Sequence, residues 1–247
     1  MMQSVDGRSL TDQVSRLITQ AIHDGTLAPA TMYSIVQLAD ELGVSRSPVR
    51  EALLRMAEAG IVRIERNRGF SIVRPLARDV VEIFAIRLAL EVYAVGRVSR
   101  TANSGLASTL RDDLRAAHQR AAECDEEGFF RHDFNFHDHI LEAAGNDRAR
   151  NTVLRLRETM RILGPATTAA GRSLAAIEAE HEPIITGITD GNAAAAMQAM
   201  MEHLTHTGLL LTQHALRLER GTTAEGSTDD DSDDVAGALV IWHSLIG

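Results

Sequence analysis

The sequence predicts a mostly α-helical protein, with three helices and a β-hairpin first and an all-helical antiparallel bundle after them. Apolar residues recur at helical spacing through most of the chain, whereas between Val62 and Ile72 the period shortens to about two residues. Glycines separate the later helical stretches by short loops, as in antiparallel bundles. We expect three parts, which are residues 1–75, 76–220 and 221–247.

Composition excludes several classes of protein. Of the 247 residues, 45% are apolar, which is enough for a buried core. No apolar run approaches the length of a membrane span, and residues 1–13 contain no apolar signal segment, so we expect a cytoplasmic protein without membrane contact. One cysteine, Cys124, excludes a disulfide scaffold. Aromatic residues make up 4%, which argues against single-strand binding by base stacking.

The first part of the chain contains three stretches with helical spacing of apolar residues. They cover 10–22, 35–42 and 45–59. Each is preceded or opened by a serine that can cap a helix, and these residues are Ser9, Ser34 and Ser45. Gly43 supplies a sharp turn between the second and third helices. The last two stretches therefore predict a helix-turn-helix.

The segment after Gly60 reads as a two-stranded hairpin. Val62, Ile64, Phe70 and Ile72 alternate with polar residues, and Asn67-Arg68-Gly69 separates the two runs. A hairpin behind a helix-turn-helix is the wing of a winged helix-turn-helix, and Pro75 marks its boundary with the next part.

The start of the third helix has the residues of a double-stranded DNA reader. In a helix-turn-helix this end of the second helix enters the major groove. Arg46 and Arg50 are one turn apart on one face, and an arginine fork matches the edge of guanine. Ser45 and Ser47 can bind phosphate. Taken alone, each arginine could equally be an ordinary solvent-exposed helix residue. Its combination with the turn and the hairpin favours DNA binding.

The predicted wing adds positive charge to this surface. Arg66 and Arg68 at its tip can reach phosphate or the minor groove, and Gly69 allows a close backbone approach. Within 45–75 there are 7 arginines and 3 acidic residues, although the whole chain has a net charge of -9. A small basic segment on an acidic protein is compatible with a specific nucleic-acid footprint.

The second part contains helical stretches and no convincing strand. They cover 78–101, 105–125, 127–144, 147–163, 172–190 and 192–219. The third part opens with GTTAEGSTDDDSDD, which should be disordered. The apolar segment VAGALVIWHSLIG that follows docks on the bundle or on a partner, and the sequence leaves this choice open.

Four side chains on the apolar faces of the bundle suggest a metal site. Asp133 and His137 are one turn apart on one predicted helix, while His181 and His203 lie on apolar stripes of two others. Such groups are costly to bury unpaired, and one divalent ion satisfies all four. A lone inward histidine is more often a hydrogen-bonded core residue.

Asp133 has a competing interpretation, and so has Arg87 on the first predicted helix of the bundle. Asp133 can equally be a surface acid paired with Arg131 or Arg157. Three imidazoles and one carboxylate suit zinc, nickel or manganese, and they leave the ion with positive charge and open positions for a small bidentate carboxylate. Arg87 can clamp a second carboxylate of that effector, or it can be a surface residue paired with Glu91.

The N-terminal motifs resemble a known family. GVSRSPVREALLRMAEAGIV and NRGFSIV are similar to the winged helix of GntR-type bacterial transcription regulators, over about 10–75. The resemblance implies that Ser45, Arg46, Ser47, Arg50 and Gly69 contact DNA. One departure is Ser34-Ile35-Val36, which stands where members usually carry a charged, often arginine-containing stretch.

The bundle resembles the FCD effector domain of the FadR-like branch of these regulators. HDFNFHDHILEAAGN and EHEPIITGITDGNAAAAMQAMMEHL carry its Asp-x3-His pair, a later histidine and a His-Leu near the last helix. The resemblance implies that Asp133, His137, His181 and His203 bind a divalent metal. Pro183 is uncommon beside such a histidine and is expected to bend its helix.

These observations favour a ligand-responsive transcription regulator over an enzyme. We expect a repressor that binds double-stranded operator DNA as a homodimer and senses a small carboxylate effector. One alternative is a metal-dependent hydrolase, for which Glu178, Glu180 and Glu182 are candidate bases, although no HExxH pattern is present. Another is a regulator with a purely structural metal and an acyl ligand.

Overall fold

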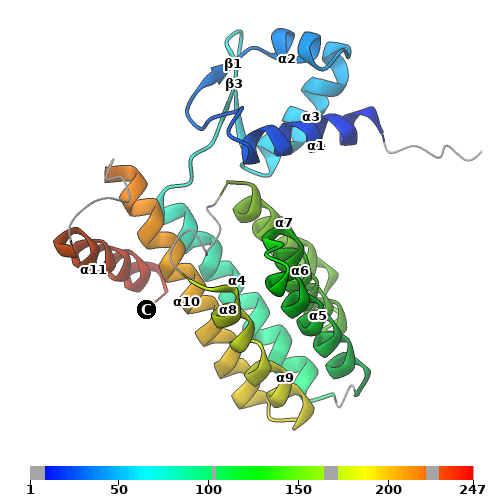
Figure 1. Cartoon of the computed structure of the whole chain (residues 1–247), viewed down its shortest axis with the longest axis vertical. Coiled ribbons are helices and arrows are strands. Elements are labelled where there is room, and N and C mark those ends of the chain that lie inside the picture. Colours follow the sequence, from blue (N-terminus) through cyan, green and yellow to red (C-terminus); the bar gives the residue numbers. More distant parts are fainter. Residues whose placement is uncertain (1–8, 102–103, 164–171, 221–227, 247) are drawn as a thin grey trace, which may run out of the picture. The chain divides into compact units, whose positions relative to one another are not determined.

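The computed structural model describes residues 9–101, 104–163, 172–220 and 228–246. The chain divides into two compact units, one of residues 1–74 with 158–164 and one of residues 75–157 with 165–247. Both units are mostly helical, which confirms the predicted fold class (Figure 1). None of the described helices is both long and apolar enough to cross a bilayer.

The first unit contains the three predicted helices. They are α1 (Leu10–His23), α2 (Ile35–Glu41) and α3 (Arg46–Glu58). Ser9 caps α1 in a capping box with Asp12, and Ser34 caps α2 through the backbone N–H of Gln37. Ser45 occupies the N-cap position of α3, but its side chain makes no capping hydrogen bond, which corrects the expected cap.

The predicted hairpin is present and belongs to a slightly larger sheet. Its strands are β2 (Val62–Glu65) and β3 (Gly69–Ile72), and β1 (Met32–Tyr33), which the sequence did not predict, gives the order β1-β3-β2. All neighbours are antiparallel, with Val62 opposite Ile72 and Tyr33 opposite Phe70. The rings of Tyr33 and Phe70 are 5.7 Å apart, so aromatic packing helps to hold the two-residue strand.

The helices and the sheet of the first unit share one apolar core. One face of α3 packs into this core, so its other face points outward. The core residues of α3 are Val49, Ala52, Leu53 and Met56, and those around them include Val14, Ile18, Leu38, Val62, Phe70 and Ile72. Their helical and two-residue spacings are the patterns that the sequence shows.

Gly69 is needed for the β1–β3 contact. Its φ is +125°, and an added Cβ would overlap the carbonyl oxygen of Tyr33. We expect Gly69→Ala to lower the free energy of unfolding by about 3 kcal/mol or more, measured by urea denaturation. Gly60→Ala is the control because Gly60 also has a positive φ, +75°, with open space around it. It should cost about 1 kcal/mol, and equal losses would contradict the steric explanation.

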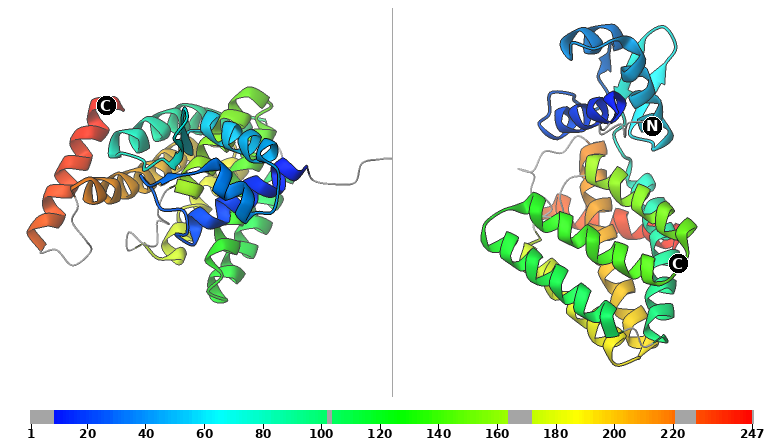
Figure 2. Two further views of the ribbon diagram at one scale, coloured as in Figure 1. Left: turned by 90° about the horizontal axis from the view of Figure 1, so that it is seen from above. Right: turned by 90° about the vertical axis from the view of Figure 1, so that its right-hand side faces the viewer.

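Most of the remaining helices begin close to predicted positions. The remaining helices are α4 (Ala77–Ser99), α5 (Ser104–Ala122), α6 (Glu126–Ala143), α7 (Asp147–Leu163), α8 (Leu174–Ala179), α9 (Glu182–Thr189), α10 (Ala193–Arg220) and α11 (Thr228–Leu245). Of these, α9 and α11 were not predicted as separate helices. Within the second unit α4 packs along α10, and α5 packs along α6 (Figures 1 and 2). Three buried histidines, described below, lie in the interior between these two pairs of long helices.

The stretch predicted as one helix over 172–190 is two short helices. α8 ends at Ala179 and α9 starts at Glu182, with His181 at the N-cap of α9. Pro183 lies in the first turn of α9, where its missing N–H removes no helical hydrogen bond. Where a bend was expected at this proline, Glu180 and His181 instead form a turn that separates α8 from α9.

The acidic stretch of the third part is not disordered throughout, contrary to the prediction. Residues 221–227 lie outside the described part, but Thr228–Leu245 form α11, which packs on α4 and α10. Asp234 is 2% exposed and pairs with Arg217 and Arg220 of α10. The indole of Trp242 is buried 6.3 Å from the ring of Phe84. Neutralised charge and apolar burial explain why this segment folds.

Candidate metal centre and nucleic-acid interface

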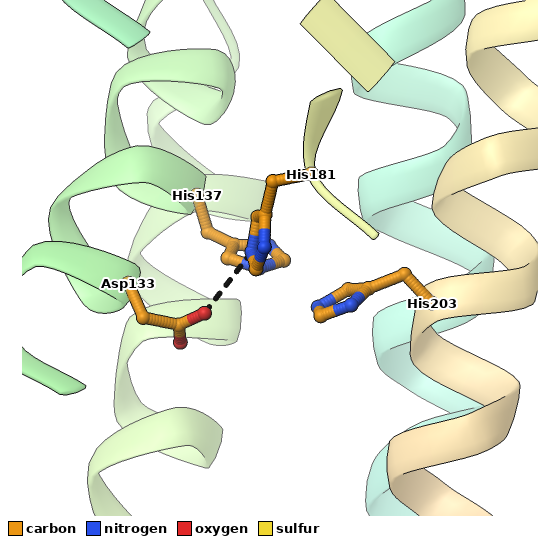
Figure 3. A group of neighbouring side chains, drawn as sticks. All are labelled: Asp133, His137, His181 and His203. Carbon is orange, nitrogen blue, oxygen red and sulfur yellow. Dashed lines mark ion pairs between the residues drawn. The ribbon is translucent and has the colours of Figure 1, made fainter. Parts of the chain in front are cut away.

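The structure brings the four predicted metal ligands together in the second unit. Asp133 and His137 come from α6, His181 from the start of α9 and His203 from the middle of α10, and Figure 3 shows them facing one another. One ligand atom from each lies within 4.8 Å of the others. The histidines are 0%, 2% and 4% exposed, in chain order, so this group is part of the interior.

Local sequence explains how the four side chains meet. The spacing of Asp133 and His137 places them one turn apart on α6. The break before α9 directs His181 inward. Gly187 of α9 lies against α10, where an added Cβ would be 2.6 Å from the backbone nitrogen of Ala196. This close approach of α9 and α10 brings the His181 and His203 rings to a centroid separation of 4.5 Å.

Each histidine has its Nδ1 atom held by an oxygen outside the cluster. His137 Nδ1 is 2.5 Å from Glu91 Oε2, His203 Nδ1 is 2.8 Å from Glu180 Oε2, and His181 Nδ1 is 2.8 Å from the Ile177 carbonyl oxygen. These acceptors require Nδ1 to donate, so the proton sits there and the Nε2 lone pair remains free. Partners of this kind orient histidines that bind metals.

Two of these Nε2 atoms lack hydrogen bonds among the described residues. Those of His137 and His181 are both buried and unpartnered. His181 Nε2 lies 3.1 Å from Asp133 Oδ1, so two acceptors face each other (Figure 3). Leaving such atoms unsatisfied costs about 1–3 kcal/mol each. A cation between them removes this cost, and the donor set of three nitrogens and one carboxylate fits a divalent transition-metal ion.

The electrostatics of the cluster suit metal ligation. Burial lowers the pKa of His137 to about 3 and that of His203 to about 4, so both rings are neutral at pH 7. Burial opposes ionisation of Asp133, but Arg157, His181 and His137 together outweigh it and hold the pKa of this carboxyl well below its usual range. Neutral imidazoles and an ionised carboxylate are the forms that bind metals.

Arg87 is buried, but its partner is Glu91. Arg87 Nε donates to Glu91 Oε1 over 2.7 Å, and its guanidinium lies 4.7 Å from the centre of the Phe84 ring. The Arg87–Glu91 pair, which the sequence analysis gave as an alternative, is therefore present, but it lies in the interior rather than on the surface. Because Glu91 also holds His137, Arg87 is a positioning residue for this ligand. Its contact with an effector stays a prediction.

Asp133 likewise has the arginine partner that the sequence offered as an alternative. Arg157 Nη2 donates to Asp133 Oδ2 over 2.7 Å. The pair leaves Oδ1 facing His181, so ion pairing and metal ligation are compatible at this residue. Arg131, the other candidate partner, is exposed.

The buried histidines make the stability of metal-free protein sensitive to acid. Unfolded histidines take up protons near pH 6.5, whereas folded His137 and His203 stay neutral to about pH 3 and 4. Acid therefore favours the unfolded chain, and the free energy of unfolding should fall by about 2 kcal/mol from pH 6 to pH 5. Urea denaturation at both pH values measures this. The double variant His137→Gln/His203→Gln should show a much flatter dependence, and an equally steep one would contradict the assignment.

The predicted DNA-contacting residues of α3 form one exposed surface of the first unit. Ser45, Arg46, Ser47 and Arg50 are all exposed. Neither arginine has an ion-pair partner in the described part of the chain, whereas Arg55 pairs with acids of α1 and α3. Both guanidinium groups therefore remain available to a nucleic acid.

One of the two arginines at the tip of the wing is not free for DNA, as the sequence analysis expected, but forms an ion pair. Arg68 pairs with Glu65 over 2.6 Å on the surface, and Arg66 is exposed. Gly69 has a structural reason to be glycine, its contact with Tyr33. Contacts of Arg68 and Gly69 with DNA stay predictions.

The sequence did not reveal the outer partners of the cluster. Glu91 was visible only as a partner of Arg87, and Glu180 only as a flanking acid. The Ile177 carbonyl gives no sequence signal, because backbone oxygens carry no residue identity. A buried acid on an apolar stripe was the one signal that could have found Glu91.

Comparison with known proteins agrees with both units. Residues 10–72 match the model described as bacterial regulatory proteins, gntR family, and residues 82–206, just over half of the chain, match the FCD domain. The HTH-type transcriptional regulator YdhC of Bacillus subtilis is 28% identical over 193 residues, covering 76% of this chain and 85% of that protein. The "Probable D-xylose utilization operon transcriptional repressor" of Paenarthrobacter nicotinovorans is 29% identical over 199 residues, covering 79% and 86%.

Solved structures share the fold. Escherichia coli McbR/YncC has a TM-score of 0.69 at 21% identity, covering 84% of this chain and 99% of that one. A GntR regulator from Rhodococcus sp. RHA1 has a TM-score of 0.66 at 24% identity, covering 83% and 98%. A helix-turn-helix unit with an FCD domain defines a DNA-binding transcription regulator, not the hydrolase that was the alternative. The chain belongs to the GntR family of bacterial regulatory proteins, with an FCD domain in its second unit.

Proposed function

We propose that this protein is a ligand-responsive repressor that binds operator DNA as a homodimer and senses a small carboxylate at a divalent metal ion. The observation that carries the proposal is the pair of buried, unpartnered Nε2 atoms of His137 and His181, the latter facing the carboxylate of Asp133. Protein atoms alone leave this group unsatisfied, and a cation completes it.

The metal would be held by Asp133, His137, His181 and His203. Zinc, nickel and manganese all accept such donors. With three neutral ligands and one anionic ligand, a divalent ion keeps about one positive charge and attracts an anion. Glu91, Glu180 and the Ile177 carbonyl hold the imidazoles in place before any ion binds, which lowers the cost of assembling the site.

DNA recognition would rest on the exposed face of α3. Arg46 and Arg50 face solvent without ion pairs in the described residues, as side chains that read base edges must. A two-fold dimer would present two such helices to successive major-groove segments of a palindromic operator. Repression is supported by the Paenarthrobacter relative, which is named a probable transcriptional repressor.

Effector control requires that ligand binding in the second unit change the affinity of the first unit for DNA. Such coupling is typically 5–150-fold. We place the effector at the cluster because this group combines buried Nε2 lone pairs without hydrogen bonds, four side chains that could hold a cation, and a neighbouring small pocket.

Native mass spectrometry with metal analysis and an operator-binding assay test the proposal together. We expect two chains per particle and one divalent ion per chain. Operator DNA is first selected from random duplexes by the wild-type protein, and mobility shifts are then measured with a panel of small carboxylates.

One or more carboxylates should lower operator affinity about tenfold. Chelation and His137→Gln should both remove this effect, whereas His214→Gln, a histidine of α10 outside the cluster, should retain it. Metal-free protein that still responds fully to the same acid would overturn the metal-sensing proposal, and a response to long acyl chains alone would favour a structural ion.

A further inference from the structure

A small pocket opens directly beside the metal cluster. Asp133 and His181, two of the proposed ligands, contribute to its lining. Apolar side chains supply much of the rest, and they are Leu114, Ala117, Phe129 and Phe136. All four belong to α5 and α6. The pocket therefore adjoins the proposed metal position.

The lining contains a second polar pair that the metal site does not use. Asp113 of α5 is 9% exposed, and His132 of α6 lies near it. His139 Nδ1 is 2.7 Å from Asp113 Oδ2 and fixes the orientation of the carboxylate. Asp113 Oδ1 is 3.7 Å from His132 Nδ1, which is too far for a hydrogen bond.

One polar atom of the Asp113–His132 pair has no hydrogen bond. His132 Nδ1 is buried and has no hydrogen-bond partner among the described residues. A hydroxyl group placed between the two residues can donate to Asp113 Oδ1 and accept from His132 Nδ1–H at the same time. A methyl group can do neither, and a carboxylate would meet the negative charge of Asp113. The local chemistry therefore selects a hydroxyl.

We propose that Asp113 and His132 form a hydroxyl subsite, so that the effector is a short carboxylate with a hydroxyl group away from the carboxylate. The inference rests on the proposed function, because the carboxylate end is assigned to the metal. The side chains between the polar groups are apolar, which suits the carbon chain of such an acid. Plain fatty acids and dicarboxylates of the same length lack a group that satisfies both Asp113 and His132.

Calorimetric titration of zinc-loaded full-length protein with matched acids tests the subsite. Each set contains an ω-hydroxy acid, the acid in which methyl replaces hydroxyl, and the dicarboxylate. The sets are 3-hydroxypropionate with butyrate and succinate, 4-hydroxybutyrate with pentanoate and glutarate, and 5-hydroxypentanoate with hexanoate and adipate. In the best-fitting set, the hydroxy acid should bind about tenfold more tightly than either analogue.

Two substitutions of similar volume remove the subsite and keep the metal ligands. Asp113→Leu and His132→Phe should each bring the affinity ratio of hydroxy acid to methyl analogue close to one, with zinc content unchanged. Asp112→Leu is the matched control, since Asp112 is the preceding and exposed residue of α5. It should retain the tenfold ratio.

The outcomes separate this inference from the proposed function. If wild-type protein binds hydroxylated and methyl analogues equally in every set, the gap holds water only and the subsite is wrong, while metal-dependent carboxylate sensing stands. Tighter binding of a dicarboxylate likewise overturns the subsite alone. If the zinc-loaded protein binds none of these acids, the subsite is wrong, and if the protein binds none of zinc, nickel and manganese, both proposals fail.

Discussion

Alanine at Arg46 or at Arg50 should strongly weaken specific operator binding while the first unit stays folded. Both side chains are exposed at the start of α3, and neither takes part in the apolar core or in an ion pair among the described residues. A bidentate arginine–guanine contact is worth about 1–3 kcal/mol of discrimination. Each substitution should therefore reduce the specific affinity by about 10- to 100-fold.

Mobility shifts with the selected operator measure this loss, and circular dichroism checks the fold. Arg16→Ala is the matched control, because Arg16 is an exposed arginine of α1. Higher salt should weaken all variants, since phosphate contacts dominate affinity. Sequence-specific binding that survives in both Arg46→Ala and Arg50→Ala would show that α3 does not read the operator.

Zinc should raise the thermal unfolding midpoint of the metal-stripped protein by about 8 °C at a hundredfold excess over its dissociation constant. Such an excess contributes about 2.7 kcal/mol, and a unit of this size gains roughly 2–4 °C per kcal/mol. The gain arises because the ion satisfies the buried Nε2 atoms of His137 and His181, which have no hydrogen bond among the described residues. His203→Gln removes one donor and should abolish most of the rise.

The quantity compared is the zinc-dependent rise, since His203→Gln also disturbs the core of the metal-free protein. His214→Gln is the control, as it lies on the same helix in a half-buried position outside the cluster. It should keep the full rise. A rise that is equal in wild-type and His203→Gln protein would place the ion elsewhere.

Periodicity made much of this arrangement predictable. The four proposed ligands were found because each interrupts an apolar stripe with a group that is costly to bury, and Asp133 and His137 share one helix face. The winged helix was found because Gly43 and the change of period after Gly60 are local signals. Both depend on neighbours in sequence.

The features that the sequence did not predict depend on contacts between residues far apart in the chain. β1 is two residues long, and only its pairing with β3 defines it. Asp234 looks like one more acid in a polar stretch until Arg217 and Arg220 are placed beside it. Composition alone therefore predicted disorder where tertiary ion pairs and the burial of Trp242 stabilise α11.

Trp242 is the single tryptophan of the chain, and its position gives the molecule an intrinsic optical probe. Its indole contacts Phe84, whose ring supports Arg87, and Arg87 holds the glutamate that orients His137. Ultraviolet emission from one known site thus reports on the packing of α11 and of this chain of side chains. Titrations with ions or acids can be followed without an attached dye.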